Sequence, residues 1–231
     1  KIKVIVKNFG KQTRYINKVF FNSLNNNRPH ITLKIASTAD GKIATKSKKS
    51  KWITNSVSRQ HGHMLRAQND CMLVGRGTIE EDNPALDCRL SGLESFSPDL
   101  FILDSTVSIP NHYKIFSNHS RNVFVFYSDG KKRSNLNKKN IKYIKVSKRG
   151  SELSLREILN KITNLGYMRV LVEGGSHLSS SLIKNNYVNE IQWFRASKII
   201  GKGGVDAVSD MGVSNMKSTK NFVLIKKKNY G

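Results

Sequence analysis

Acidic residues are scarce in this sequence of 231 residues. Lys and Arg number 40 against 16 Asp and Glu, which gives a formal net charge of +24. Such an excess attracts nucleic acids or small anions. The basic runs at 131–133 and 137–140 lack the interleaved aromatic residues typical of a single-strand binding surface. We therefore favour a drift of composition toward Lys and Asn, with some benefit for binding a phosphorylated small molecule, and we do not expect nucleic acid as a partner.

Cysteines are also few, and long apolar runs are absent. Cys71 and Cys88 are the two cysteines, too few for a zinc quartet or a disulfide framework, so we expect no metal site. Cys71 lies in an apolar run and is predicted to be a core thiol, and the low cysteine content favours a cytoplasmic location. No apolar run approaches the roughly 18 residues of a membrane-spanning helix, and no signal-peptide pattern is present, so we expect no membrane partner. The sequence does not begin with Met, which indicates a fragment or a processed form.

Apolar runs of strand length alternate with segments of helical spacing through most of the chain. Strands are predicted at 2–6, 31–36, 71–74, 100–103, 123–127, 141–146, 170–172, 191–194 and 222–225. Helices are predicted at 16–24, from Asn55 or Ser56 to about Ala67, from Ser154 to about Leu165, and at 177–184. This alternation predicts an α/β protein with a largely parallel or mixed sheet. We expect residues 1–27 to form a lead-in and residues 28–231 to form one domain.

Small and polar residues gather where four predicted strands end, at 36–40, 75–78, 104–105 and 173–176. Ligands of such sheets bind beyond the carboxyl ends of the strands, so we expect these positions to converge on one site. At the last of them Glu173 and the pair Gly174-Gly175 precede a helix start, whose free N–H groups bind anions. The alternative is an ordinary strand-to-helix turn with a solvated Glu173.

Seven short blocks then identify a family. They lie at 28–34, 40–44, 50–54, 65–67, 74–78, 82–84 and 172–175. In order and spacing they resemble the reductase domain of the bacterial riboflavin-biosynthesis deaminase/reductase, across about residues 28–205. The resemblance implies a dihydrofolate-reductase-like fold with a mixed central sheet flanked by helices.

The resemblance also implies an activity. Members of the family use NADPH to reduce the ribose of 5-amino-6-(5-phosphoribosylamino)uracil to the ribityl chain, by hydride transfer to C1′ of an imine. The implied partners are this phosphorylated pyrimidine and a second copy of the chain in a homodimer. A close alternative is reduction of the undeaminated diaminopyrimidinone, and an alternative of another class is a basic nucleic-acid-binding module.

Bifunctional members of the family carry a zinc deaminase before the reductase. Its His-x-Glu and Pro-Cys-x-x-Cys motifs are absent from this sequence, so we expect no deaminase activity from this chain. Residues 1–27 resemble the tail of that deaminase and its linker. We therefore expect a covalently linked deaminase domain beyond this chain, and a stand-alone reductase stays open.

Site residues are carried over from the resemblance position by position. The positions that match cofactor contacts are Ala36, Trp52, Thr78, Asp82, Ser105, Gly175, Ser176, His177, Leu178, Ser179, Ser180 and Ser181. Those that match substrate contacts are Ser50, Arg66, Leu86, Arg89 and Glu173, and Lys34 matches a lysine near the ribose. For several of them a plain structural role stays open: core packing for Trp52, and caps of a helix or turn for Thr78 and Asp82.

The charged members of this set suit the implied chemistry. Lys34 and Glu173 are predicted to be an acid/base or orienting pair, or else a structural ion pair between neighbouring strands. Arg66 and Arg89 are predicted to bind the 5′-phosphate as bidentate donors, with solvated arginines as the alternative. Selection of NADPH over NADH requires a cation near the 2′-phosphate, and the sequence does not identify it.

Overall fold

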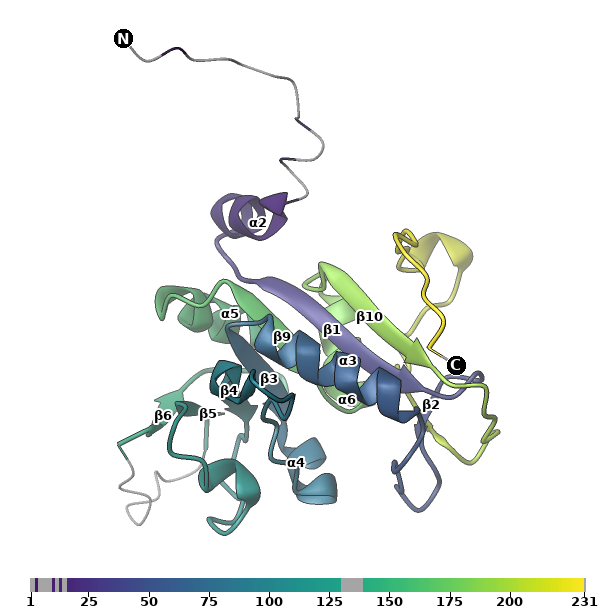
Figure 1. Cartoon of the computed structure of the whole chain (residues 1–231), viewed down its shortest axis with the longest axis horizontal. Helices are drawn as coiled ribbons and strands as arrows, with labels where there is room; N and C mark the ends of the chain where they lie inside the picture. The colour runs from purple at the N-terminus through teal and green to yellow at the C-terminus, as the bar shows by residue number, and fades with distance from the viewer. Residues whose placement is uncertain (1–2, 4–9, 11–12, 14–15, 130–138, 231) are drawn as a thin grey trace.

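A seven-stranded sheet runs through the centre of the protein, in the order β10-β1-β9-β3-β4-β5-β6 (Figure 1). The computed structural model describes residues 3, 10, 13, 16–129 and 139–230, so the strand predicted at 2–6 lies outside the described residues. The strands are β1 (His30–Ser37), β3 (Cys71–Gly75), β4 (Asp99–Leu103), β5 (Val123–Tyr127), β6 (Ile141–Lys145), β9 (Arg169–Glu173) and β10 (Glu190–Arg195). All described pairings in this sheet are parallel. The predicted α/β class is confirmed.

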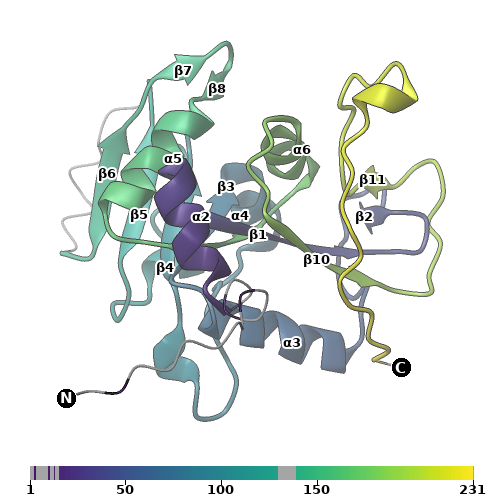
Figure 2. The same ribbon diagram turned by 90° about the horizontal axis from the view of Figure 1, so that it is seen from above.

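Helices cover both faces of the sheet. They are α2 (Lys18–Asn26), α3 (Ser56–Ala67), α4 (Arg76–Asp82), α5 (Leu155–Asn164) and α6 (Ser176–Lys184). Figure 2 shows α5 and α6 on one face and α3 on the other. Two small antiparallel sheets pair β2 (Lys42–Ala44) with β11 (Val205–Asp206) and β7 (Lys148–Arg149) with β8 (Glu152–Leu153). Short 3-10 helices lie at η1 (Glu94–Phe96), η2 (Lys114–Phe116) and η3 (Met216–Ser218).

The central strands are apolar throughout because both of their faces are buried. In β3, Cys71 and Leu73 belong to the core under α5 and α6, whereas Met72 and Val74 belong to the core on the opposite face. A parallel sheet between two layers requires such continuous apolar runs rather than alternation. The same pattern made these strands recognisable in the sequence, and Cys71 is a buried thiol as predicted.

The helix starts agree with their sequence signals. Asn55 caps α3, since its side chain accepts a hydrogen bond from the backbone N–H of Ser58 over 2.9 Å. Ser154 caps α5 in the same way through the N–H of Glu157. The helix predicted at 16–24 is α2, which lies two residues later at both ends.

The strand predicted at 222–225 is wrong. This segment has no regular structure, and Val223 and Leu224 are 89% and 78% exposed. An apolar run becomes a strand where a partner strand and a core are available. The end of the chain instead contacts α3, because the Tyr230 ring packs at a tilt against His61 with 4.4 Å between ring centroids.

Candidate active site

Four strand ends meet at one edge of the sheet. The strands β1, β9, β3 and β4 are neighbours and run parallel, so their carboxyl ends lie side by side (Figure 1). The turns after β3 and β9 are joined by a hydrogen bond of 3.1 Å, which the backbone N–H of Gly175 donates to Oγ1 of Thr78. The predicted convergence of the strand ends is confirmed.

Three charged side chains form a cluster at this edge, which we call the buried charge cluster: Lys34, Arg66 and Glu173. Lys34 in β1 and Glu173 in β9 are register partners, with 3.5 Å between Nζ and Oε2. Arg66, in the last turn of α3, binds the same carboxylate with two N–H groups, over 2.8 Å from Nε to Oε1 and 2.9 Å from Nη2 to Oε2. The guanidinium fork of Arg66 is therefore held by Glu173, and Arg66 is not a solvated arginine.

The local sequence explains how α3 reaches the cluster. Alternation along β9 places Glu173 on the same face as Leu171, which belongs to the core on the α3 side. Gly62 is the buried residue of α3, and a Cβ atom there would lie 4.0 Å from Cε of Lys34. The helix therefore passes over Lys34 at about van der Waals distance.

Electrostatics keep Glu173 ionised. Burial is the largest influence on this side chain and by itself raises the pKa. The attraction of Arg66 and of Lys34, with their hydrogen bonds, outweighs burial and lowers the pKa of Glu173 to about 2. The pKa of Arg66 is raised, since the Glu173 carboxylate more than offsets the lowering by burial. At neutral pH Glu173 accepts hydrogen bonds and has no proton to donate.

The segment 83–89 after α4 contains the predicted substrate residue Leu86. Its side chain packs in the core, and its φ is +54°. The buried side chain of Arg121 donates from Nη1 to the carbonyl of Leu86 over 2.6 Å and from Nη2 to the carbonyl of Ala85 over 2.5 Å. The buried Arg121 side chain thus fixes the backbone of this segment through two of its carbonyl groups.

The other end of the segment 83–89 is fixed by α3. Arg66 Nη1 donates to the carbonyl of Asp87 over 2.9 Å, and His63 Nδ1 lies 3.1 Å from the same oxygen. His63 Nε2 lies 3.4 Å from Nη2 of Arg89, whose side chain is 66% exposed. Burial, and then the charges of Arg66 and Arg89, lower the pKa of His63. The backbone N–H of Arg89 also lies 3.3 Å from Nδ1, so the His63 ring contacts both the backbone and the side chain of this segment.

Sequence reasoning missed part of this network. Arg121, Asp87 and His63 were not predicted to have a role. Arg121 lies two residues before β5, and its partners are backbone carbonyl groups, which leave no signal in the sequence. For Asp87 there was no signal either, because its contribution is a backbone carbonyl.

A second group of predicted residues lies around the loop before α3. Ser50 Oγ is 3.2 Å from Oδ1 of Asp82, at the end of α4. Trp52 is 63% exposed, which argues against core packing, and the guanidinium carbon of Arg59 lies 4.3 Å from its ring centroid. Lys198 donates to the carbonyl of Trp52 over 2.7 Å. An aromatic plane open to solvent is available here for a ligand to stack on.

The predicted residues 175–181 divide into two sets. The side chains of Leu178, Ser179 and Ser180 are buried. His177 and Ser181 contact Glu152 of β8 instead, over 3.4 and 3.1 Å. What α6 offers to the sheet edge is therefore the backbone N–H groups of its first turn, after the cap residue Gly175.

The two remaining predicted cofactor residues also lie at strand ends. Ala36, near the end of β1, is half-buried and pairs with Phe194. Ser105 follows β4, and its carbonyl accepts hydrogen bonds from the N–H groups of Ser128 and Asp129 over 3.1 and 3.0 Å. Ser105 thereby joins the ends of β4 and β5.

A hollow of about 620 Å³ lies at the opposite edge of the sheet. Asp70, directly before β3, and Arg169, the first residue of β9, line it together with residues of α2 and η1. It is therefore separate from the buried charge cluster.

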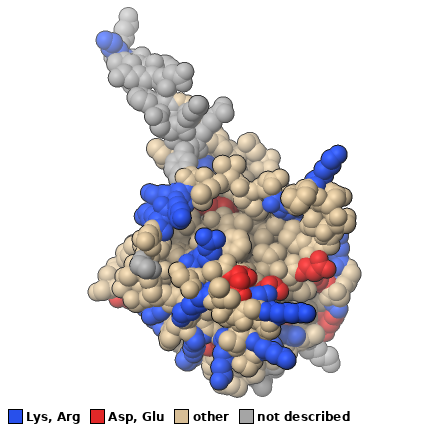
Figure 3. All heavy atoms as spheres, turned by 90° about the vertical axis from the view of Figure 1, so that its right-hand side faces the viewer, with Lys and Arg blue, Asp and Glu red and all other residues tan. Residues whose placement is uncertain are grey.

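The described part of the chain contains no group of three or more His, Cys, Asp or Glu that could hold a metal ion. Within the same residues no helix is long and apolar enough to cross a membrane. On the face drawn in Figure 3, Lys and Arg form several separate groups, with Asp and Glu between some of them. That face does not present one continuous basic surface.

Comparison with known proteins gives a consistent result. The family described as "RibD C-terminal domain" matches residues 29–229. The riboflavin biosynthesis protein RibD of Aquifex aeolicus is 31% identical over 210 residues, which are 90% of this chain and 57% of that protein. The chain spans about half the length of the curated relatives it matches.

Solved structures agree with the sequence relatives. A diaminohydroxyphosphoribosylaminopyrimidine deaminase/5-amino-6-(5-phosphoribosylamino)uracil reductase from Thermotoga maritima superposes with a TM-score of 0.77 at 29% identity, over 94% of this chain and 58% of that one. RibD of Acinetobacter baumannii superposes with a TM-score of 0.84 at 23% identity, over 97% of this chain and 61% of that one. The second similarity concerns the fold alone.

Proposed function

The chain belongs to the RibD C-terminal domain family, and on that premise we propose that it is an NADPH-dependent reductase of riboflavin biosynthesis. The proposed substrate is 5-amino-6-(5-phosphoribosylamino)uracil, the compound in the name of the Thermotoga maritima relative. Its ribose is reduced to the ribityl chain by hydride transfer to C1′ of the ring-opened imine. The observation that carries this proposal is the buried charge cluster, which lies where ligands of α/β sheets bind.

The groups around Gly175 fit the phosphates of a nicotinamide dinucleotide. Backbone N–H groups at a helix start, beside the Thr78 hydroxyl, are donors that suit an anion. When bound, the dinucleotide supplies the hydride. We propose that Ala36, Trp52, Thr78, Asp82, Ser105 and residues 175–181 hold it, the last of these through the backbone of the first helical turn.

The two catalytic candidates have different roles in this proposal. Because Arg66 and Lys34 keep Glu173 ionised, Glu173 orients Lys34 and accepts hydrogen bonds from the sugar. Lys34 carries N–H donors and delivers the proton that the substrate nitrogen gains as the C=N bond is reduced to C–N. The electron pair for the new C1′–H bond comes with the hydride, so the two transfers balance.

The substrate phosphate needs a cation that is open to solvent. Arg89 has such a guanidinium, and His63 and Asp87 hold it beside the buried charge cluster. We propose that Arg89 binds the 5′-phosphate, helped by Ser50 and by the N–H groups of Arg66 that Glu173 and Asp87 leave available. Leu86 contributes through the backbone that Arg121 fixes.

An assay with two substrates tests the proposal. NADPH oxidation is followed by absorbance with 5-amino-6-(5-phosphoribosylamino)uracil and with the undeaminated diaminopyrimidinone side by side. We expect turnover with the uracil, since the curated bacterial relatives are RibD proteins. Lys34→Met is the matched control and is expected to bind NADPH without oxidising it. Binding of NADPH with no oxidation by either pyrimidine would contradict the catalytic proposal.

The assembly is also proposed from the family. We propose a homodimer in the cytoplasm and a deaminase domain linked to this reductase, since the matched relatives are nearly twice as long. Light scattering of this chain tests the dimer. A measured mass of twice that of one chain would support it, and the mass of one chain would contradict it.

A further inference from the structure

Trp52, one of the proposed cofactor residues, presents a large aromatic ring to solvent. The residue is 63% exposed, and no described residue accepts a hydrogen bond from its indole Nε1. The other tryptophan of the chain, Trp193, is held by such a bond, because its Nε1 donates to Oγ of Ser37 over 2.8 Å. The orientation of the Trp52 ring therefore depends on a contact with its face.

Arg59 makes this contact. Its guanidinium carbon lies 4.3 Å from the centroid of the Trp52 ring, within reach of a cation–π interaction. Arg59 Nη1 also donates to the carbonyl of Thr54 over 2.8 Å, and Arg59 has no ion pair with a described carboxylate. A guanidinium that is fixed by the backbone and has no carboxylate beside it keeps the indole ring as its main side-chain partner.

The backbone of Trp52 is held from another element. Lys198, in the chain after β10, donates from Nζ to the carbonyl of Trp52 over 2.7 Å. Lys198 thus fixes the position of the residue, and Arg59 fixes the orientation of its ring. Because Arg59 covers one face of a ring that is still largely exposed, the opposite face is open to a ligand.

The helix α3 places Arg59 relative to the buried charge cluster. Arg59 and Arg66 are seven residues apart, about two turns, so they share one face of α3 and are about 10 Å apart along its axis. The start of the helix is fixed, since Asn55 caps it and also donates from Nδ2 to the carbonyl of Tyr230 over 2.8 Å. One face of α3 therefore reaches both the buried charge cluster and Trp52.

We propose that Arg59 is a positioning residue for the nicotinamide dinucleotide and acts through Trp52, whose ring it holds with the open face toward the cofactor. The inference rests on the proposed function, because Trp52 is a cofactor residue of that reaction. A ring that is already oriented loses less conformational freedom when the ligand binds. The apparent affinity scales with the fraction of molecules whose ring is in place. Without the guanidinium that fraction is expected to fall by about two- to thirtyfold, the span of cation–π interactions.

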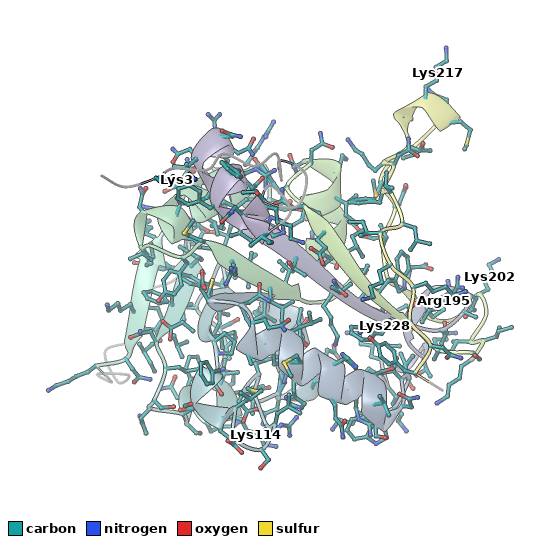
Figure 4. All side chains as sticks on the ribbon, turned by 45° about the horizontal axis from the view of Figure 1, so that its top comes forward. Lys3, Lys114, Arg195, Lys202, Lys217 and Lys228 are labelled. Carbon is teal, nitrogen blue, oxygen red and sulfur yellow. The ribbon has the colours of Figure 1, made fainter. Side chains whose placement is uncertain are left out.

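A double-mutant cycle tests whether Arg59 acts through the ring. The dissociation constant of NADPH is measured by calorimetry for the wild type, Arg59→Met, Trp52→Leu and the double variant. Arg59→Lys keeps a cation without the planar guanidinium. Lys217→Met is the matched control, since the labelled Lys217 side chain lies on η3, away from α3, in Figure 4. Urea unfolding of each variant checks that it is folded.

Arg59→Met is expected to weaken NADPH binding by about two- to thirtyfold in the wild-type background and to have no effect in the Trp52→Leu background. Arg59→Lys is expected to keep part of the affinity, and Lys217→Met to keep all of it. Wild-type affinity of Arg59→Met, or an equal weakening in both backgrounds, overturns the inference.

The outcomes separate this inference from the proposed function. If Trp52→Leu weakens NADPH binding and Arg59→Met does not, the inference alone fails. If the two positions are coupled as expected and neither pyrimidine is reduced, the reductase proposal alone fails. A wild type that does not bind NADPH overturns both.

Discussion

The substitution Glu173→Gln tests the buried charge cluster most directly. It keeps the size of the side chain and one carbonyl acceptor, and it removes the charge that faces Arg66 and Lys34. The drop in the pKa of Glu173 from its ordinary value of 4.5 to about 2 corresponds to about 3 kcal/mol in favour of the folded state. The free energy of unfolding at pH 7 is therefore expected to fall by about 3 kcal/mol.

The pH dependence has a defined sign. A carboxylate whose pKa is lower in the folded state stabilises the fold above its unfolded pKa, and this stabilisation disappears as the pH falls through the folded value. For Glu173 the window runs from about pH 4.5 down to about pH 2. Urea unfolding at several pH values is expected to show a difference between wild type and Glu173→Gln at pH 7 that shrinks across this window.

Turnover gives the second measurement on the same variant. Without the carboxylate Lys34 loses its orienting partner, and kcat is expected to fall by about a hundredfold or more, within the range of acid–base contributions. Glu190→Gln is the matched control, because Glu190 is bonded to Lys18 at the amino end of β10 and is expected to leave kcat unchanged.

Two results would refute different parts of this reasoning. A Glu173→Gln protein as stable as the wild type at pH 7 would refute the electrostatic role of the cluster. A destabilised variant with full turnover would leave Glu173 as a structural ion-pair partner and would remove it from the mechanism.

Three further substitutions probe the neighbouring contacts. Arg66→Ala is expected to raise KM for the pyrimidine about tenfold and to lower kcat, because Glu173 loses its bidentate partner; an unchanged KM would refute its role at the phosphate. Thr78→Val removes the acceptor of the Gly175 N–H and is expected to cost about 1 kcal/mol in thermal unfolding and to raise KM for NADPH alone; an equal rise in both KM values would contradict this. Arg121→Met leaves two carbonyls without donors and is expected to cost about 2–4 kcal/mol in urea unfolding; wild-type stability would show that this clamp is dispensable.

Much of the fold could be predicted because burial on both faces leaves continuous apolar runs. The strands Cys71–Gly75 and Arg169–Glu173 are examples, and the special residues after them follow from the parallel arrangement. The wrong prediction of a strand at 222–225 also came from a continuous apolar run. An apolar run does not reveal whether a partner strand is available, and here the anchoring ring of Tyr230 lies several residues later.

The site was predictable where it depends on neighbouring strands and not where it depends on helix orientation. Lys34 and Glu173 could be paired because both follow from strand positions. The bond between Arg66 and Glu173 joins residues 107 positions apart and depends on how α3 crosses the sheet. Arg121 was missed because its partners are carbonyl groups, which every residue possesses.

Several of the few carboxylates in this chain have defined structural partners. Six acidic side chains accept hydrogen bonds from backbone N–H groups at turns and element ends: Asp40, Asp70, Asp99, Asp104, Glu157 and Asp210. Glu173 holds the buried charge cluster. Acidic residues are thus retained at positions where backbone or buried donors need an acceptor. An excess of 24 positive charges can arise in this way from a shortage of surface acids.

A nucleic-acid-binding module needs cations gathered on one face of the molecule. In Figure 3 the groups of Lys and Arg are separated. The face drawn in Figure 3 therefore does not have the gathered cations that the nucleic-acid alternative requires.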